Sequence, residues 1–454
     1  MRSPRPAPMG LPLWMLRICA TVLAFFVLLI ALSALGVTWS RAVVISSAAL
    51  ILAVALLVTA YDRGRIRSDP EGTRHMRDGT WHLRDGTWHR TGHPFEGTWH
   101  RLELLGGGTV LAIFAVATQA GWNVMSDYVF HWGMKGRRFA AVGGLDFDFL
   151  ALPWHAHLHP DYPNLLPTLY GAGFVLTERT DWTVVAPWSI LFFVLFLGAG
   201  RSLARDAISD PAVRVLGLGT LWAACLAFAV QPMVAGGADL PLAVAVLLAC
   251  HALLLPTSCV RDRALQDLHV GLVAAFAAAC KLEGMPLAAT LIGLHGLKIY
   301  AAADGEHVPR LRRAAASVAR AAALPAIVVG LWLGPVLTHG LFLESNTAGL
   351  DLGRLPTVIR RLAVQLVHPV WHGMPVVLLG LPLALWKKGP RRLPALLLLI
   401  QSAFYVYVYL AGPVDTELWI RTSASRLFLH VVPAATLLVL GTVSTSNDDP
   451  VSGG

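Results

Sequence analysis

Apolar segments of helical length alternate with short polar segments along almost the whole chain. The segments 13–36, 43–60 and 104–120 are apolar runs with few charges. A helix needs about 20 such residues to cross a bilayer, where its backbone hydrogen bonds must be satisfied internally. With the runs further along the chain, the pattern predicts an all-α polytopic membrane protein with roughly twelve transmembrane helices.

The composition supports a membrane location. Of the 454 residues, 56% are hydrophobic and 14% are charged, whereas soluble domains carry about 25% charged residues. An ordinary soluble enzyme is therefore excluded. The net charge of +9 comes from arginine clusters between apolar segments, as expected for basic loops retained in the cytoplasm, so we expect no nucleic-acid partner. The five cysteines are odd in number, which argues against a disulfide framework and against a zinc ribbon.

The basic residues assign a side to each loop. Because Lys and Arg are retained on the cytoplasmic side, the basic segments 62–103, 310–320 and 387–392 are placed there, together with both termini. The loops left for the outer side are 121–163, 236–239, 338–354 and 412–426. We expect a multi-pass protein of the cytoplasmic (inner) membrane with its active site on the outer face.

Two stretches do not fit simple crossings. Only one crossing is allowed between the first outer loop and Arg201, but two apolar runs lie there, and 165–176 is shorter than a spanning helix. We expect that segment on the outer membrane surface. The stretch 268–300 must cross twice, so its helices must be short or broken near Pro286.

The chain divides into four regions. The first apolar run is interpreted as an uncleaved helix, because it is long, contains Arg17 and is followed at once by a second run. The regions are two transmembrane helices at 1–61, a cytoplasmic loop with a repeated motif at 62–103, a core at 104–441 that includes the outer loop 121–182, and a polar cytoplasmic tail at 442–454.

The repeated motif is Gly-Thr-Trp-His, at 79–82, 86–89 and 97–100. Its histidines could bind a metal, and its tryptophans could anchor at a membrane interface beside basic charge. Because the spacing is irregular and no Cys or carboxylate stands in ligand geometry with these histidines, a tandem duplication in a flexible polar loop is the favoured explanation. We place no chemistry there.

The first outer loop is unusual in composition. Asp127, His131 and Lys135 follow at i, i+4 and i+8 and would share one helix face, with Trp132 and Phe139 on an apolar side. Such a segment suits the membrane surface, where Asp127 could act as a general base toward an acceptor hydroxyl or amine. A surface carboxylate paired with Lys or Arg is the alternative that the spacing leaves open.

Three histidines stand at alternate positions later in this loop: His155, His157 and His159, followed by Asp161. Alternate positions share one face of an extended strand, so these side chains are candidates for a divalent metal site. We expect no other cofactor. Neighbouring prolines make the segment stiff and non-helical.

Five short motifs occur in the order found in a known family. They are Asp127-x4-Trp132-x2-Lys135, His-Pro-Asp-Tyr-Pro at 159–163, Gly-Ala-Asp-Leu-Pro at 237–241, Lys-Leu-Glu-Gly at 281–284, and Trp419-x3-Ser423-x2-Arg426-Leu427-x2-His430-x2-Pro433. With this set the chain resembles bacterial membrane glycosyltransferases of the GT-C fold, the superfamily of protein O-mannosyltransferases and aminoarabinose transferases, which use polyprenyl-phosphate-linked sugars.

The resemblance implies a fold and a set of roles. The fold is a GT-C-like transmembrane core with juxtamembrane helices in the first large outer loop, and the reaction is an inverting transfer of a hexosyl or pentosyl unit. By motif, Asp127 is the catalytic base, Arg426 binds the donor phosphate, and Asp239 lies near the acceptor or orders the first loop. The other implied substrate-binding residues are Lys135, His159, Asp161, Tyr162, Lys281, Glu283 and His430.

The chain also departs from the family pattern. Asn123 stands where an Asp after Trp would compete for the catalytic role, Gly136 replaces the usual Ala, and Leu282 replaces Asn. The first two helices and the repeat loop lie outside the resemblance. A relative that has lost catalysis therefore stays among the alternatives.

The expected function is transfer of a sugar from a polyprenyl-phosphate donor to a lipid, glycan or protein acceptor. A positioned guanidinium stabilises the charge that develops on the leaving phosphate, and apolar spans provide a groove for the isoprenoid tail. Two other classes stay open. A transporter or lipid flippase would show broken helices at the midplane and related halves, and a polymerase or ligase would act on polyprenyl-diphosphate glycans.

Overall fold

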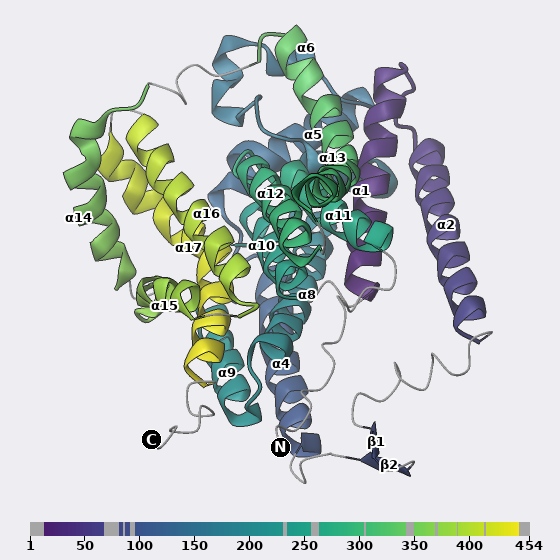
Figure 1. Cartoon of the computed structure of the whole chain (residues 1–454). Coiled ribbons are helices and arrows are strands. Elements are labelled where there is room, and N and C mark those ends of the chain that lie inside the picture. The colour runs from purple at the N-terminus through teal and green to yellow at the C-terminus, as the bar shows by residue number, and fades with distance from the viewer. Residues whose placement is uncertain are drawn as a thin grey trace.

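The computed structural model is helical almost throughout, as expected for an all-α membrane protein (Figure 1). It describes residues 13–67, 81–84, 87–90, 96–229, 234–255, 263–303, 306–341, 349–367, 371–387, 389–412 and 415–444. The α-helices are α1 (Leu13–Ala34), α2 (Arg41–Arg67), α4 (Glu96–Gln119), α5 (Gly133–Val142), α6 (Phe147–Leu150), α7 (Leu165–Thr177), α8 (Trp182–Ala207), α9 (Pro211–Ala229), α10 (Asp239–Leu254), α11 (Arg263–Cys280), α12 (Gly284–Ala302), α13 (His307–Thr338), α14 (Leu355–Leu366), α15 (Leu381–Trp386), α16 (Arg392–Ala411) and α17 (Thr416–Ser444).

Eight of the described helices are long and apolar enough to cross a membrane: α1, α2, α4, α8, α12, α13, α16 and α17. These are the helices of a multi-pass membrane protein. Shorter apolar helices of 10–17 residues include α7 and α10, and at a rise of about 1.5 Å per residue they fall short of a hydrocarbon core of about 30 Å. The expected number of roughly twelve crossings therefore stays a prediction.

Helix α10 lies inside the bundle because it is apolar on every side. All its residues from Asp239 to Leu254 are buried, and it packs against α8, α11, α16 and α17. A helix that is hydrophobic all round needs other helices around it. Most of α17 is buried too, whereas 11% of the apolar window of α2 is buried and α2 stands at the edge beside α1 (Figure 1). The fold thus holds Asp239 in its interior.

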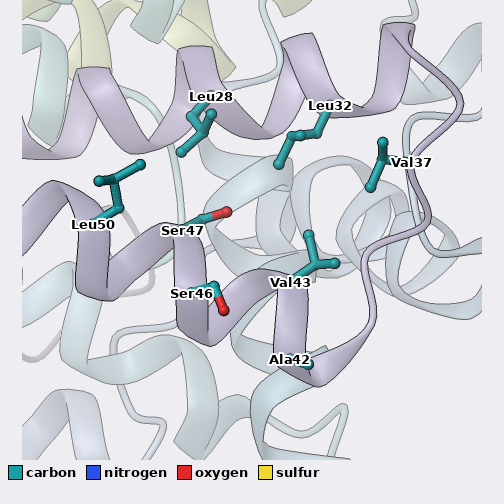
Figure 2. A pocket seen from close by; sticks show the side chains of 8 residues that line it. All are labelled: Leu28, Leu32, Val37, Ala42, Val43, Ser46, Ser47 and Leu50. Carbon is teal, nitrogen blue, oxygen red and sulfur yellow. The ribbon is translucent and has the colours of Figure 1, made fainter.

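An open apolar groove of about 370 Å³ separates the facing sides of α1 and α2. Figure 2 shows the side chains that line it: Leu28, Leu32, Val37, Ala42, Val43, Ser46, Ser47 and Leu50. On its other faces α2 exposes Leu56 and Leu57. An apolar helix with so little protein around it is suited to contact with lipid.

Helices α11 and α12 form a hairpin whose turn consists of Lys281, Leu282 and Glu283. The chain therefore reverses at Lys281 and Glu283, between the two helices predicted for the stretch 268–300. Of the two predicted alternatives, short helices or a break near Pro286, the structure has the first, because α11 has 18 residues and α12 has 19. Pro286 is in the first turn of α12, where a helix does not need the backbone N–H. The helix continues from there to Ala302.

Helix α7 has 13 residues, which agrees with its prediction as a short segment. It is not exposed on a surface, however. Its residues from Leu165 to Ala172 are buried, and it packs against α1, α2, α5 and α8. Gly136 of α5 allows the close approach, since a Cβ atom there would lie 2.8 Å from Cβ of Tyr170. Gly136 is thus part of a helix contact.

The Gly-Thr-Trp-His repeat contributes to a β-hairpin and to a helix. Strand β1 (Trp81–Arg84) pairs antiparallel with β2 (Thr87–Arg90), and His82 lies opposite His89. The third copy is in the first turns of α4, which begins at Glu96. The region expected to be a flexible loop through residue 103 is therefore partly regular structure.

Candidate functional site

An ion pair joins α17 to the segment 121–163, which is expected on the outer side and which we call the first outer loop. Asp127 directly precedes the π-helical turn Tyr128–Trp132, and Nη1 of Arg426 donates a hydrogen bond to Oδ2 of Asp127. The side chains are 19% exposed for Asp127 and 22% exposed for Arg426, so both keep some contact with the surroundings. Two residues chosen from separate motifs are therefore in contact.

The carboxylate of Asp239 lies beside this pair and is buried. Its Oδ1 accepts a hydrogen bond from Nζ of Lys281 at 3.0 Å and lies 3.1 Å from Nε2 of His430. Its Oδ2 is 3.8 Å from Nη1 of Arg426. The guanidinium thus lies between one partly exposed carboxylate and one buried carboxylate.

Lys281 occupies the turn between α11 and α12, with its side chain 9% exposed. Its Nζ also contacts Oε1 of Glu283 at 3.1 Å. Burial alone would lower the pKa of Lys281, but Asp239 and Glu283 raise this pKa well above its ordinary value. The turn is tight, because a Cβ atom on Gly284 would lie 1.8 Å from the carbonyl oxygen of Ala277. A charged ammonium is therefore held rigidly next to Asp239.

Two tyrosines of α16 extend this network. The hydroxyl of Tyr405 lies 2.7 Å from Nδ1 of His430, and that of Tyr409 lies 2.9 Å from Oγ of Ser423. They stand at i and i+4, so they share the helix face that meets α17. The sequence interpretation missed both tyrosines, although paired hydroxyls on one face of an apolar helix are a usable signal. Both ring nitrogens of His430 have partners, which fixes the ring.

Lys135, in the first outer loop, is fully buried. Its ammonium group donates to the carbonyl oxygen of His159 at 3.1 Å and lies 4.9 Å from the ring centre of Trp132. Burial lowers the pKa of Lys135 to about 7, although the nearby carboxylate of Asp161 acts to raise it. This lysine connects the helical half of the loop to the histidine-rich half.

His159 is at the junction of these halves, with a left-handed backbone φ of 50°. Its ring centre lies 4.7 Å from that of His131 and 4.7 Å from that of Tyr162. Burial, followed by His131 and nearby cations that include Lys281 and Arg426, lowers the pKa of His159 to about 3. The imidazole is therefore neutral at physiological pH.

Asp161 and Tyr162 follow on the buried side of the loop. The side chain of Asp161 is 1% exposed. Burial raises the pKa of Tyr162, and Glu283 is the next cause. The phenol therefore stays protonated close to the carboxylate of the α11–α12 turn, so the loop and that turn form one polar region.

The helical part of the loop presents a different face from the predicted one. Asp127, His131 and Lys135 were expected together on a polar face, but Lys135 is buried and the apolar Phe130 is 57% exposed. The π-helical turn Tyr128–Trp132 is the physical reason, since its wider turn rotates the residues that follow. The prediction of one shared polar face is wrong for Lys135.

The other two histidines of the loop have separate partners. The segment Pro153–Leu158 is a 3₁₀-helix rather than a strand, since a proline at its first position favours a helical turn. Nδ1 of His155 lies 2.7 Å from the carbonyl oxygen of Phe149, and Nδ1 of His157 lies 2.9 Å from that of Trp154. The prediction that the alternating histidines share one strand face is wrong. Within the described part of the chain, no three His, Cys, Asp or Glu residues are grouped to hold a metal.

The first outer loop also pairs with the turn that precedes α10. Val124 and Ala235 form a parallel bridge, and the N–H of Met125 donates to the carbonyl oxygen of Ala235 at 3.0 Å. A Cβ atom on Gly237 would lie 1.8 Å from Sδ of Met125. A larger residue at 237 would require the side chain of Met125 to move.

Asn123, which stands where a competing carboxylate was considered, is buried. Its Nδ2 donates to Oγ1 of Thr118 at 3.1 Å. The amide is neutral, so this interior position does not require a counter-charge. Asp127 is accordingly the carboxylate of this segment that reaches Arg426.

The structure brings six of the predicted residues into one network, which we call the carboxylate–arginine cluster: Asp127, Asp239, Lys281, Glu283, Arg426 and His430. It forms where α10 and α12 begin and α11 ends. Basic residues gather at the opposite helix ends. There Glu103, buried, accepts hydrogen bonds from Arg201 at 3.0 Å and from Arg214 at 2.7 Å.

Comparisons with protein-family models, with curated proteins and with solved structures find no match to this chain. The chemistry must therefore be argued from the carboxylate–arginine cluster itself. A carboxylate that a ligand can reach can accept a proton, and a guanidinium beside it can bind a phosphate bidentately. The buried Asp239 and Lys281 fix the position of that guanidinium.

Proposed function

We propose that this protein is a membrane glycosyltransferase that moves a sugar from a polyprenyl-phosphate-linked donor to an acceptor hydroxyl or amine. The contact between Asp127 and Arg426 carries this proposal. It joins a candidate base to a candidate phosphate ligand, and both are accessible, whereas Asp239 and Lys281 are buried. The acceptor belongs to a lipid, a glycan or a protein.

The reaction needs these two groups on opposite faces of the anomeric carbon, so the contact between Asp127 and Arg426 opens when the donor enters. Asp127 takes the acceptor proton as the acceptor oxygen or nitrogen attacks the anomeric carbon. The bond from that carbon to the phosphate oxygen breaks, and the electron pair leaves with the phosphate, whose charge Arg426 stabilises. Displacement from the opposite side inverts the anomeric centre. General base catalysis contributes about 10²–10⁴-fold to such a rate.

Donor binding changes the resting contact. Arg426 contacts Asp127 and lies 3.8 Å from Asp239, so a donor phosphate competes with both carboxylates for the guanidinium. Asp239 keeps its contacts to Lys281 and His430 and stays in place. Asp127 has no second partner of this kind among the described residues, so it is released as a free base when the phosphate binds.

The proposed orientation puts the carboxylate–arginine cluster on the outer face of the inner membrane. The eight long helices, with α9, α10, α11 and the segment from α14 to α15, give roughly twelve crossings and two cytoplasmic termini. The arginine-rich helix ends then lie in the cytoplasm. On this interpretation α5, α6 and α7 are the juxtamembrane helices of a GT-C-like core, and residues such as Lys135, His159 and Asp161 shape the loop.

The geometry favours a transferase over a transporter or flippase. A transporter would place its charged site at the midplane, between discontinuous helices. Here the cluster is at helix ends, and α16 and α17 continue past it without interruption. A polymerase or ligase acting on polyprenyl-diphosphate glycans would use the same kind of arginine and differs in its donor.

The test is product formation in proteoliposomes. Purified full-length protein receives a polyprenyl-phosphate donor with a labelled sugar, together with membrane acceptors, and the label is followed into a covalent product. Glycosyltransfer predicts loss of the donor with equal gain of glycosylated acceptor. Movement of intact donor between leaflets without a new bond would identify a flippase instead, and consumption of a diphosphate-linked glycan alone would identify a polymerase or ligase.

A further inference from the structure

A second polar site lies at the arginine-rich end of the bundle, away from the carboxylate–arginine cluster. It is a cavity of about 140 Å³ lined by residues of α11, α12 and α13. These three helices lie together in the bundle (Figure 1). Arg313 and Arg320 are seven residues apart on one face of α13, with Ser317 between them, and Arg263 begins α11. The complete lining is Arg263, Ile299, Arg313, Ala316, Ser317 and Arg320.

The charge of this lining is one-sided. Three guanidinium groups and one hydroxyl surround the cavity, and its lining residues include no carboxylate. The carboxylate of Asp267 contacts two of these lining residues: it accepts hydrogen bonds from Arg320 and Ser317. Asp267 is 1% exposed. Nε2 of His295 also lies 2.8 Å from Oδ1 of Asp267. Both carboxylate oxygens of Asp267 therefore have partners, and this carboxylate holds Arg320 and Ser317 in place.

The position of the cavity relates it to the bilayer. Arg263 is the first residue of α11, and Ile299 lies close to the end of α12 at Ala302. Helices α12 and α13 are both candidate membrane spans. A pocket at the end of such spans is at the depth of lipid headgroups, and basic pockets between transmembrane helices on the cytoplasmic side bind phospholipid headgroups.

We propose that this arginine pocket binds the phosphate of an anionic phospholipid of the surrounding membrane. Guanidinium groups bind phosphate oxygens through paired, charge-assisted hydrogen bonds. The acyl chains extend along the apolar sides of α12 and α13. The bound lipid joins α11 to α13 and does not depend on the reaction at the carboxylate–arginine cluster.

Lipid retention by the purified full-length protein tests the proposal. The protein is incubated in mild detergent with phosphatidylglycerol or with phosphatidylcholine, and bound lipid is counted by native mass spectrometry. The wild type should retain phosphatidylglycerol in preference. Each arginine near an anionic lipid contributes about fivefold in affinity, so R263Q/R313Q should bind it about 25-fold more weakly. R312Q, on the same helix but outside the lining, should bind like the wild type.

A second variant separates the pocket from a folding defect. A316F fills the cavity and leaves all three arginines, so it should also lose phosphatidylglycerol while its melting temperature without lipid stays that of the wild type. Equal retention of the two lipids, or undiminished binding by R263Q/R313Q and A316F, would overturn the proposal. So would competition by millimolar inorganic phosphate that is as strong as competition by the lipid, since it would mark a site for soluble phosphate.

Discussion

The ammonium group of Lys281 lies 3.0 Å from Oδ1 of Asp239 in the interior, with the two side chains 9% and 1% exposed. The contact joins the α11–α12 turn to the first residue of α10, the helix that is buried on all sides. Glu283 is the second carboxylate on the ammonium group, at 3.1 Å. The position of Arg426 depends on this arrangement, because Asp239 also faces its guanidinium.

Replacing Asp239 by alanine should destabilise the fold strongly. The change leaves the charges of Lys281 and Arg426 with one fewer buried partner, and breaking a buried ion pair costs about 3–5 kcal/mol. Thermal unfolding in detergent measures the effect as a lower melting temperature. Asp148→Ala, at an exposed carboxylate of the first outer loop, is the control and should change stability by less than about 0.5 kcal/mol. Equal melting temperatures for both variants would argue against the buried pair.

Lys135 should make the stability of the protein depend on pH. Its pKa in the folded protein is about 7, against about 10.4 in an unfolded chain. Between these values the unfolded state binds more protons, so stability rises as the pH increases from 7 toward 10. Lys135→Met removes this dependence. As the pH rises from 7 toward 10, the melting temperature of the wild type should therefore increase relative to that of Lys135→Met. Parallel plots of melting temperature against pH for the two proteins would contradict the lowered pKa of Lys135.

A methyl group on Gly136 should separate α5 from α7. The added Cβ atom would lie 2.8 Å from Cβ of Tyr170 and 3.2 Å from the carbonyl oxygen of Pro167, and overpacking of this kind costs about 1–3 kcal/mol. Gly219→Ala is the matched control, since nothing lies within 4 Å of its added carbon and alanine favours a helix. Chemical unfolding should rank Gly136→Ala below the wild type and Gly219→Ala at or above it; the reverse order would disprove the close contact.

Much of the architecture follows from local pattern. Long apolar runs predict helices, and the charged pair Lys281 and Glu283 predicts the reversal between α11 and α12, because charges are costly inside a bilayer. Pro286 does not interrupt α12, because a proline in a first helical turn costs little. The β-hairpin is also indicated by the sequence, because Asp85-Gly86 separates the segments 81–84 and 87–90, and the dipeptide Asp-Gly favours two-residue hairpin turns.

The site was less accessible to sequence reasoning. Motifs identified Asp127 and Arg426 separately, but they are 299 positions apart, and no periodic pattern relates positions so distant. The burial of Lys135 depends on a π-helical turn that residue spacing does not reveal. The alternating histidines do not form the predicted strand, because the segment Pro153–Leu158 is a 3₁₀-helix of six residues.

Arg426 should control donor affinity. Arg426→Gln removes the charge that binds the donor phosphate, and loss of a charged hydrogen-bond partner costs about 1.5–3 kcal/mol, or roughly 10- to 100-fold in affinity. Binding of a polyprenyl-phosphate sugar measured in detergent provides the readout. Arg421→Gln is the control, because Arg421 is exposed one turn earlier on the same helix. An unchanged affinity in Arg426→Gln would remove this residue from the phosphate site.

The central claim is that Asp127 is the base of a sugar transfer. The most direct measurement is the rate of product formation in proteoliposomes at saturating donor, comparing Asp127→Asn with Asp148→Asn from the same loop. The amide keeps the shape of the side chain but cannot accept the proton, so Asp127→Asn should lose about 10²–10⁴-fold in rate and still bind donor, while Asp148→Asn stays at the wild-type rate. Transfer by Asp127→Asn at the wild-type rate would contradict the account.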